Sequence, residues 1–207
     1  MKVEKIMKFT LAILLVCVAL MCSCQQEMLH NGDIIFQVSQ STQSLAIQKA
    51  THSQYSHMGI IYILEGKLYV YEAVGPVKTT PFKKWIARGE DHHYVVKRLK
   101  DGNNLLAEEN LLKMKETGDQ FLGKPYDIYF DWSDESIYCS ELVWKIYHRA
   151  LGINIGELKT MEDFDLSSPE VQKLMNKRYP NGLPLDMAVI SPADIFNSEF
   201  LYTVTGK

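Results

Sequence analysis

The stretch SHMGIIYILEGKLYVYEAV, residues 56–74, contains two runs of β-branched and aromatic residues on either side of the dipeptide Glu65-Gly66. Two such runs joined by a short turn with glycine predict a β-hairpin. With the turn centred on Glu65-Gly66, His57 and Glu72 are diagonal neighbours on one face of the hairpin, whereas a loop of odd length would put them on opposite faces. A histidine with a carboxylate able to orient it is the arrangement that nucleophilic catalysis needs. The alternative is a solvated polar pair at a sheet end.

The other histidines are weaker candidates for a catalytic base. His52 falls in a loop or a helix end without an evident orienting partner. His92 and His93 point to opposite sides of a predicted strand, so they cannot both serve one site. No CxxC or HxxxH spacing favours a zinc site, and we expect neither a metal nor a cofactor.

Farther toward the C-terminus, the stretch SIYCSELVWKIY, residues 136–147, contains a thiol. Apolar residues recur after Cys139 at offsets of 3, 4, 7 and 11, which predicts one face of an amphipathic helix that ends at Gly152. The acidic and hydroxyl residues at 134–136 are types that suit a helix start. Because a helix N-terminus and a nearby imidazolium both lower the pKa of a thiol, Cys139 is a candidate nucleophile. The alternative is a cysteine that packs in the core as a small hydrophobe.

The remaining patterns predict strands flanked by helices, which is an α+β fold with a central antiparallel sheet. Further strands are expected at 32–39 and 92–99, and helices at 41–54, 79–89 and 104–122. An irregular loop rich in aromatic and acidic residues follows at 123–136. Residues 156–184 are polar and punctuated by proline, and we interpret them as a surface insertion. Residues 187–204 read as a strand, a helix opened by Pro192 and a last strand.

The first 24 residues differ from the rest of the chain. Three lysines precede a short apolar run that ends in LMCSC, which predicts an export signal rather than a membrane span. This end resembles a bacterial lipobox, and the resemblance implies cleavage before Cys24 and lipid attachment to it. Cys22 is the weaker candidate because Met21 precedes it. The alternative is an uncleaved anchor helix.

Removing residues 1–24 changes the charge and the cysteine count. The loss of three Lys and one Glu from 22 basic and 25 acidic residues leaves 19 and 24, a net charge of −5. No basic patch for nucleic acid remains. Cys139 becomes the single cysteine of a domain at 25–207, so no internal disulfide is expected. A lone cysteine in an exported protein suggests a reactive thiol or an intermolecular bridge.

Five short motifs in this order resemble the permuted NlpC-type papain-like hydrolases, in particular the YiiX/YaeF-like group. They are NGDIIFQ, YSHMGIIY, YVYEAV, GKPYDIYF and YCSELVWKIY. ISPADIFNSEFLYTV, residues 190–204, also resembles the C-terminal end of that group. Each motif is short, and the ordered set is more specific than any one of them.

The resemblance implies a circularly permuted papain-like fold, in which the histidine precedes the cysteine. Carried over by position, Cys139 would be the nucleophile, His57 the base and Glu72 the residue that orients it. Tyr126 in GKPYD would lie by the site and give a hydroxyl to the oxyanion; alternatively it is a loop aromatic that covers the core. The insertion at 156–184 departs from a minimal version of this fold.

The function we expect is that of a thiol hydrolase that cleaves an amide bond in a cell-wall peptide or an amino-acid amide through an acyl-enzyme. Its location would be the bacterial cell envelope, as an exported monomer attached to the membrane by a lipid anchor. A second reading is a lipid acyltransferase or esterase, as in the related lecithin retinol acyltransferase group. A third is a lipoprotein that binds peptide without catalysis.

Overall fold

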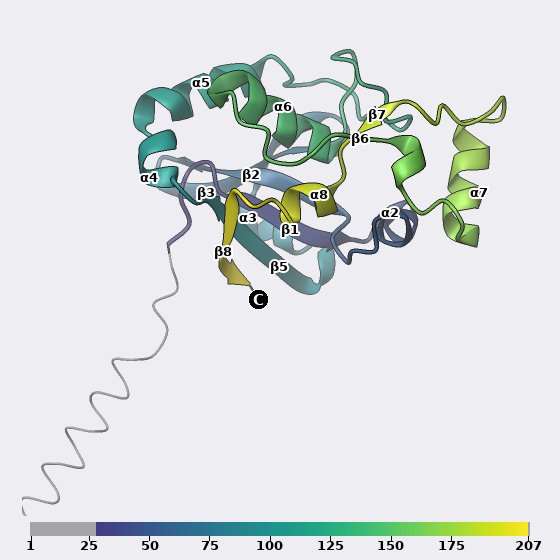
Figure 1. The fold of residues 1–207 in the computed structure, drawn as a ribbon. Coiled ribbons are helices and arrows are strands. Elements are labelled where there is room, and N and C mark those ends of the chain that lie inside the picture. The colour runs from purple at the N-terminus through teal and green to yellow at the C-terminus, as the bar shows by residue number, and fades with distance from the viewer. Residues whose placement is uncertain (1–27, 207) are drawn as a thin grey trace, which may run out of the picture.

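The computed structural model describes residues 28–206. Its centre is a six-stranded antiparallel sheet in the order β4-β3-β2-β1-β5-β8, seen across the middle of Figure 1. The strands are β1 (Ile34–Ser39), β2 (His57–Leu64), β3 (Lys67–Ala73), β4 (Val77–Pro81), β5 (Gly89–Leu99) and β8 (Leu201–Gly206). A separate two-stranded sheet pairs β6 (Lys159–Thr160) with β7 (Ala188–Val189).

The hairpin of β2 and β3 has the predicted register. Leu64 pairs with Lys67, so the turn is the dipeptide Glu65-Gly66, and both turn residues have positive φ angles of 50° and 72°. Two positive φ angles define the turn that matches the right-handed twist of paired strands. Farther along, Ile60 pairs with Tyr71, which keeps His57 and Glu72 on one face as predicted.

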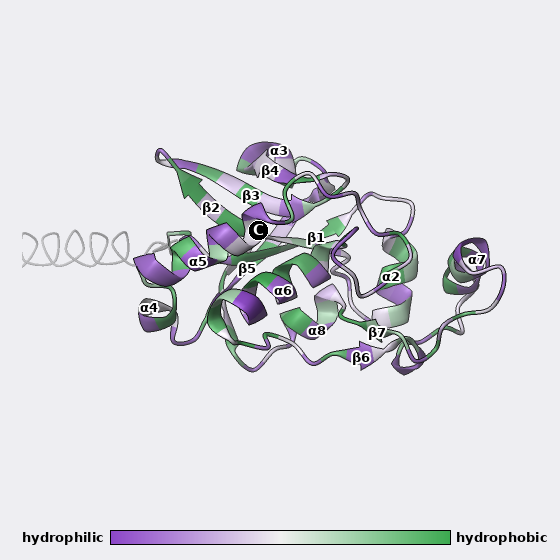
Figure 2. Cartoon of the chain, turned by 90° about the horizontal axis from the view of Figure 1, so that it is seen from above, coloured by the Kyte–Doolittle hydropathy of each residue, from purple (hydrophilic) through white to green (hydrophobic). Residues whose placement is uncertain are grey.

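Helices cover both faces of the sheet. They are α2 (Ser44–Thr51), α3 (Phe82–Ile86), α4 (Gly102–Leu105), α5 (Glu108–Asp119), α6 (Cys139–Leu151), α7 (Pro169–Arg178) and α8 (Pro192–Phe196), with a 3₁₀ turn at Met161–Asp163. Helix α6 packs on β2 and β3 and contributes Leu142, Val143 and Ile146 to the larger core. Trp85 of α3 belongs to a second core with Ile35 and Val96. In Figure 2, β2 and parts of α6 are coloured as hydrophobic.

Three predicted helices are shorter in the structure, and the one expected at 41–54 is reduced to α2. The segment 104–122 forms α4 and α5, separated by Ala107 in an extended conformation (ψ 159°). The side-chain amide of Asn110 donates to the Leu105 carbonyl, so the end of α4 is satisfied without a continuous helix. In the segment 79–89, the strand β4 runs to Pro81 because Thr80 pairs with Val70 of β3, which leaves only Phe82–Ile86 as helix.

The segment 156–184 lies at one end of the molecule and supplies α7, which packs beside α2 (Figure 1). Met161 and Val171 are buried, and the backbone N–H of Asp165 donates to the carbonyl of Ala50 in α2. The segment is thus packed onto the domain as well as exposed on its outer side.

The predicted signal at 1–24, with Cys24, lies outside the described residues. Within 28–206, none of the helices has both the length and the apolar character that crossing a membrane requires.

Candidate active site

Cys139 is the first residue of α6 and only 2% exposed. The start of the helix is fixed on both sides of this residue. Tyr138 accepts a hydrogen bond on its hydroxyl from Ile190 N at 3.1 Å, and Ser140 Oγ donates to Ile190 O at 2.8 Å. The first N–H groups of a helix have no partner within it, so the thiol lies beside a partial positive charge. A thiolate and an oxyanion are both favoured at such a position.

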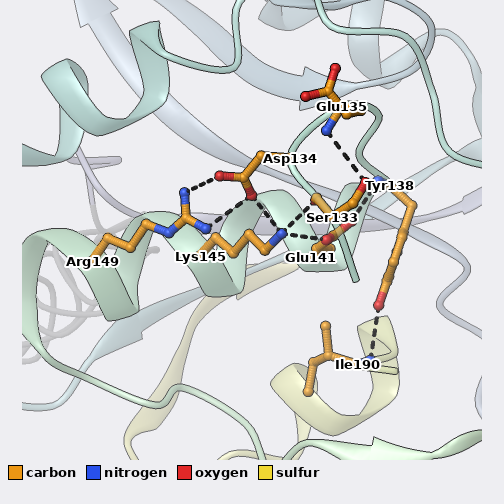
Figure 3. Close-up of polar contacts among 8 residues, drawn as sticks. All are labelled: Ser133, Asp134, Glu135, Tyr138, Glu141, Lys145, Arg149 and Ile190. Atoms are coloured by element: carbon orange, nitrogen blue, oxygen red, sulfur yellow. Dashed lines mark hydrogen bonds and ion pairs between the residues drawn. The ribbon is translucent and has the colours of Figure 1, made fainter. Parts of the chain in front are cut away.

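An ion-pair network holds the preceding loop against α6 (Figure 3). Lys145 Nζ lies 2.8 Å from Asp134 and 2.7 Å from Glu141, and it also donates to the Ser133 carbonyl. Arg149 contacts both carboxylate oxygens of Asp134. Burial raises the pKa of Glu141 to about 8 although Lys145 acts against it. The negative charge that Glu141 would place near Cys139 is therefore weakened or paired with a lysine.

His57 begins β2 and is 7% exposed. Its Nε2 atom lies 2.6 Å from Glu72 Oε2, and its ring stacks on Trp85 with 5.9 Å between the centroids. Cys139 is close enough to His57 to raise the pKa of its ring. Because Glu72 holds Nε2, the ring atom left for the thiol is Nδ1. One imidazole thus bridges the thiol and the carboxylate.

Glu72 is fully buried and has two further partners. Thr80 Oγ1 donates to Glu72 Oε1 at 2.6 Å, and Arg88 Nη2 donates to the same oxygen. Burial alone would raise the pKa of Glu72, but the hydrogen bonds from His57 and Thr80 and the charges of His57 and Arg88 lower it to about 2. The carboxylate is therefore ionised at neutral pH, with each of its oxygens engaged.

Burial by itself lowers the pKa of His57, but the hydrogen bonds and charges of Cys139 and Glu72 outweigh it and raise this pKa to about 9. At neutral pH the ring is therefore an imidazolium between two groups that are anionic or can become so. A charged imidazole next to a thiol is the environment in which a cysteine reacts as a thiolate.

Tyr126 lines the same cavity as Cys139. Burial raises the pKa of its hydroxyl well above the usual value, and the charge of Cys139 adds to the increase, so the hydroxyl keeps its proton. Its loop is anchored to the segment before Cys139, since Asp127 N donates to Ile137 O and Ile137 N donates to Pro125 O. Gln43 Nε2 donates to the Tyr126 oxygen at 2.8 Å.

Two hollows meet at this site. An apolar cavity of about 60 Å³ is lined by Cys139 and Tyr126 together with side chains that include Ala46, Ile47, Phe130, Met161, Leu166, Met175, Val189 and Pro192. A wider polar hollow of about 450 Å³ is lined by His57 and Tyr126 together with residues that include Ser39, Ser41, Gln43, Ser56 and Arg88. Tyr126 stands between them, with the thiol on the apolar side and the imidazole on the polar side.

The structure brings together the four residues singled out from the sequence: Cys139, His57, Glu72 and Tyr126. His52 lies elsewhere, exposed and 3.2 Å from Asp165. Sequence reasoning missed Thr80 and Arg88, the partners of Glu72, because residues 79–89 were interpreted as a helix from its threonine cap. Recognition of a strand at Val77–Pro81 would have made Thr80, which pairs with Val70, a diagonal neighbour of Glu72. No sequence signal pointed to Gln43.

The family model described as permuted papain-like amidase enzyme, YaeF/YiiX, C92 family matches residues 28–205. The chain belongs to this family. The predicted α+β fold with a permuted papain-like topology is thereby confirmed, and so is the resemblance to the YiiX/YaeF-like group. Membership also makes the chain a cysteine hydrolase of the amidase type at the level of the family.

Two relatives have high identity to this member of the family. The uncharacterized protein YiiX of Escherichia coli (strain K12) is 51% identical over 175 residues, which cover 84% of this chain and 85% of that protein. A crystal structure described as metalloprotein yiiX from Escherichia coli O157:H7 is 50% identical, has a TM-score of 0.82, and covers 86% of this chain and 97% of the other.

The word metalloprotein in that description raises the question of a metal site in this chain. Among residues 28–206, no group of three or more His, Cys, Asp or Glu side chains gathers in a way that could hold a metal ion. In the site itself, Glu72 directs its two oxygens to His57, Thr80 and Arg88. The described residues therefore do not fit a metal centre, and the steps below involve only the chain's own groups.

Proposed function

We propose that this chain is a lipoprotein of the bacterial cell envelope that cleaves an amide bond in a cell-wall peptide or an amino-acid amide, through an acyl-enzyme on Cys139. The observation on which the proposal rests is the imidazole of His57, which bridges the thiol and a fully buried carboxylate and has its pKa raised to about 9. Burial of the charged His57–Glu72 pair beside a helix-terminal thiol carries a desolvation cost. Strongly perturbed pairs of this kind concentrate at functional sites.

The reaction begins with the Cys139 thiolate and the His57 imidazolium. Sulfur attacks the amide carbon, a C–S bond forms, and the carbonyl electrons move onto oxygen. The Tyr126 hydroxyl and the N–H groups at the start of α6 are positioned to stabilise that oxyanion. The tetrahedral species collapses, the C–N bond breaks, and His57 gives its proton to the leaving amine, which departs.

The second half of the reaction restores the enzyme. Neutral His57 accepts a proton from water as the water oxygen attacks the thioester carbon, and a new oxyanion forms in the same place. Its collapse breaks the C–S bond, releases the carboxylic acid and leaves the thiolate beside the imidazolium. Glu72 keeps the ring in one orientation and stabilises its charge throughout without taking the proton.

The two hollows indicate how a substrate would lie. Because His57 protonates the leaving group, the amine side belongs in the polar hollow, and the acyl side belongs by Cys139 in the apolar cavity. A cavity of about 60 Å³ has room for about four water-sized groups, comparable with an aliphatic amino-acid side chain. This size favours an acyl group of amino-acid dimensions, joined to a polar amine.

The apolar character of the same cavity is what favours the second candidate, a lipid ester hydrolase or acyltransferase. The two candidates differ in the length of the acyl group. A panel of defined muropeptides, aminoacyl amides and lipid esters, given to the purified chain and to Cys139→Ala, separates them. We expect amine release from aminoacyl or stem-peptide amides, together with a thioester adduct of the substrate acyl group on Cys139 in the intact mass.

Turnover only of lipid esters would replace the amidase with the second candidate. Binding of peptides by both forms, with turnover by neither, would leave a binding lipoprotein.

The lipoprotein part of the proposal has its own test. The basic start, the apolar run and Ser23 before Cys24 support cleavage there. The intact mass of the protein from the membrane fraction should correspond to a chain that begins at Cys24 and bears acyl chains. A mass that starts at Met1, or a mature chain without lipid, would contradict it.

A further inference from the structure

Tyr126 has two kinds of neighbour, and the geometry fixes which of them receives its proton. A phenol hydroxyl has one proton to donate and an oxygen that accepts. The Gln43 amide donates to that oxygen at 2.8 Å, so the bond to Gln43 does not use the phenol proton. The proton is left for the side of the hydroxyl that faces the apolar cavity, which Tyr126 and Cys139 both line.

The orientation of the Gln43 amide depends in turn on Arg178. Arg178 Nη2 lies 2.5 Å from Gln43 Oε1. A guanidinium has only donors, so the atom of Gln43 that faces it must be the oxygen, and the NH₂ group must face Tyr126. A reversed amide would set donor against donor at Arg178. The arginine therefore selects the one amide orientation that makes Tyr126 a donor toward the thiol.

Each member of this chain of hydrogen bonds is held by separate contacts. Gln43 directly precedes α2, whose first residue, Ser44, contacts Ser56 through their hydroxyls at 2.6 Å, next to His57. Arg178, the last residue of α7, lies over the Phe130 ring at 4.9 Å, and Phe130 packs edge-on against Tyr138. The segment 156–184 thereby reaches the site through the end of α7.

We propose that Arg178 and Gln43 are positioning residues that force the Tyr126 hydroxyl to donate its proton toward the Cys139 thiolate and the oxyanion that forms beside it. This inference rests on the proposed function and extends it. It assigns to the segment 156–184 a part in the chemistry, because the arginine that orients the amide comes from that segment. Neither residue touches the reacting atoms.

Gln43→Glu tests the proposal sharply because it keeps the shape of the side chain and its pair with Arg178. The second carboxylate oxygen can only accept, so the Tyr126 proton turns toward it and away from the thiol. We expect kcat on the amide substrate to fall by roughly 10²-fold, close to the loss in Tyr126→Phe, with KM changed much less.

The double variant Gln43→Glu/Tyr126→Phe separates positioning from a general effect of the added charge. Without the phenol proton, Gln43→Glu should cost less than about threefold, since what it redirects is already absent. Equal losses from Gln43→Glu in the wild-type background and in the Tyr126→Phe background would overturn the proposal, and so would an unchanged kcat in Gln43→Glu.

Arg178→Met gives the second arm, with Lys177→Met as its control. Both remove one positive charge from the end of α7, but Lys177 is exposed and makes no contact with Gln43 among the described hydrogen bonds. We expect a loss of roughly tenfold in kcat for Arg178→Met, because the amide is free to reverse, and none for Lys177→Met. Equal losses of kcat in the two variants would show that only the charge at the end of α7 matters, and this would overturn the proposal.

Alkylation of Cys139 by iodoacetamide provides a readout that needs no substrate. Loss of the donated proton should lower the alkylation rate near pH 6 by about tenfold, because that proton stabilises the thiolate that reacts. Gln43→Glu should show this loss in the wild-type background and not in the Tyr126→Phe background. If Gln43→Glu slows alkylation as expected but the wild-type chain cleaves no amide, the proposed function fails while the positioning inference stands. If the alkylation rate is the same with Gln43 and with Gln43→Glu, the positioning inference alone is overturned.

Discussion

The two sides of the site are built in different ways. On the strand side, His57, Glu72 and Thr80 come from adjacent strands, so the backbone ladder of β2, β3 and β4 sets their separation before any side chain packs. On the helix side, Gln43 and Arg178 lie next to or within helices, 135 positions apart in sequence, and meet through side chains. In the proposed mechanism, the strand side holds the acid–base group, and the helix side orients a hydrogen-bond donor and lines the cavity for the acyl group.

The largest effect should come from the thiol on which both sides converge. Cys139→Ala should lower kcat by roughly 10⁴-fold or more, and His57→Ala nearly as much, because residues that react as a unit give similar losses when either is removed. Cys139→Ser should fold normally and be nearly as impaired. Turnover per folded molecule and circular dichroism would check this. Full activity in Cys139→Ser would contradict thiol catalysis and remove the basis of the comparison.

A smaller loss is expected when the strand side is altered at its carboxylate. Glu72→Gln can still accept a hydrogen bond from His57 but no longer stabilises the imidazolium, so kcat should fall by about 10²-fold. Thr80→Val removes one donor to Glu72 and should lose less, while Thr80→Ser keeps the hydroxyl and serves as the matched control. Arg178 acts only through Gln43 and Tyr126, so a larger loss of kcat in Arg178→Met than in Glu72→Gln would contradict the roles assigned to the two sides.

The pH profile follows from the raised pKa of His57. Below the lower apparent pKa of the thiol–imidazole pair the sulfur is protonated, and above about 9 the imidazolium loses its proton, so the rate should follow a bell. Beyond either limb the rate should change about tenfold per pH unit.

The same titration ties the alkaline limb to the strand side. Glu72 raises the pKa of His57, so Glu72→Gln should move this limb to lower pH, whereas Gln43→Asn should leave it in place.

The raised pKa of His57 also makes the stability of the fold depend on pH, and the stability falls as pH rises. The charged ring stabilises the fold fully below its pKa in the unfolded chain, about 6.5, and this contribution disappears as pH rises through about 9.

A chelator should not change the pH profile of the rate. Loss of activity with chelator and its return with zinc, while the alkylated enzyme still turned over, would contradict the thiol mechanism.

The smallest expected effect concerns the packing of the strand side. A Cβ at Gly59 would lie 2.5 Å from Val70 Cγ1 and 2.6 Å from the Tyr71 carbonyl oxygen, so Gly59→Ala must move β3 away from β2. We expect a loss of about 1–3 kcal/mol in the free energy of unfolding. Gly102→Ala is the matched control, because its Cβ meets nothing closer than 3.6 Å and alanine favours the helix. Denaturant unfolding of both variants measures the difference; equal stabilities would show a looser strand side.

Local sequence patterns were enough to place His57 and Glu72 on one hairpin and Cys139 at the start of a helix. A turn at Glu65-Gly66 and a side-chain period of two are local facts, and together they place His57 and Glu72 on one face without knowledge of the rest of the fold. The helical spacing after Cys139 and the stop at Gly152 are equally local, and α6 does end there with Gly152 in a left-handed conformation (φ 70°). Motif order then joined the two into one site through a family resemblance.

The groups that surround this site became visible only once the elements were packed together. Arg88 reaches Glu72 from beyond α3, and Arg178 reaches Gln43 across 135 positions. Nothing periodic or local in the sequence marks such partners. Contacts of this kind depend on how whole elements pack, and packing is set by the shapes of many side chains at once rather than by the spacing of a few. Short stretches of sequence were therefore enough to propose the nucleophile, the base and its orienting carboxylate, but not the further residues that contact them.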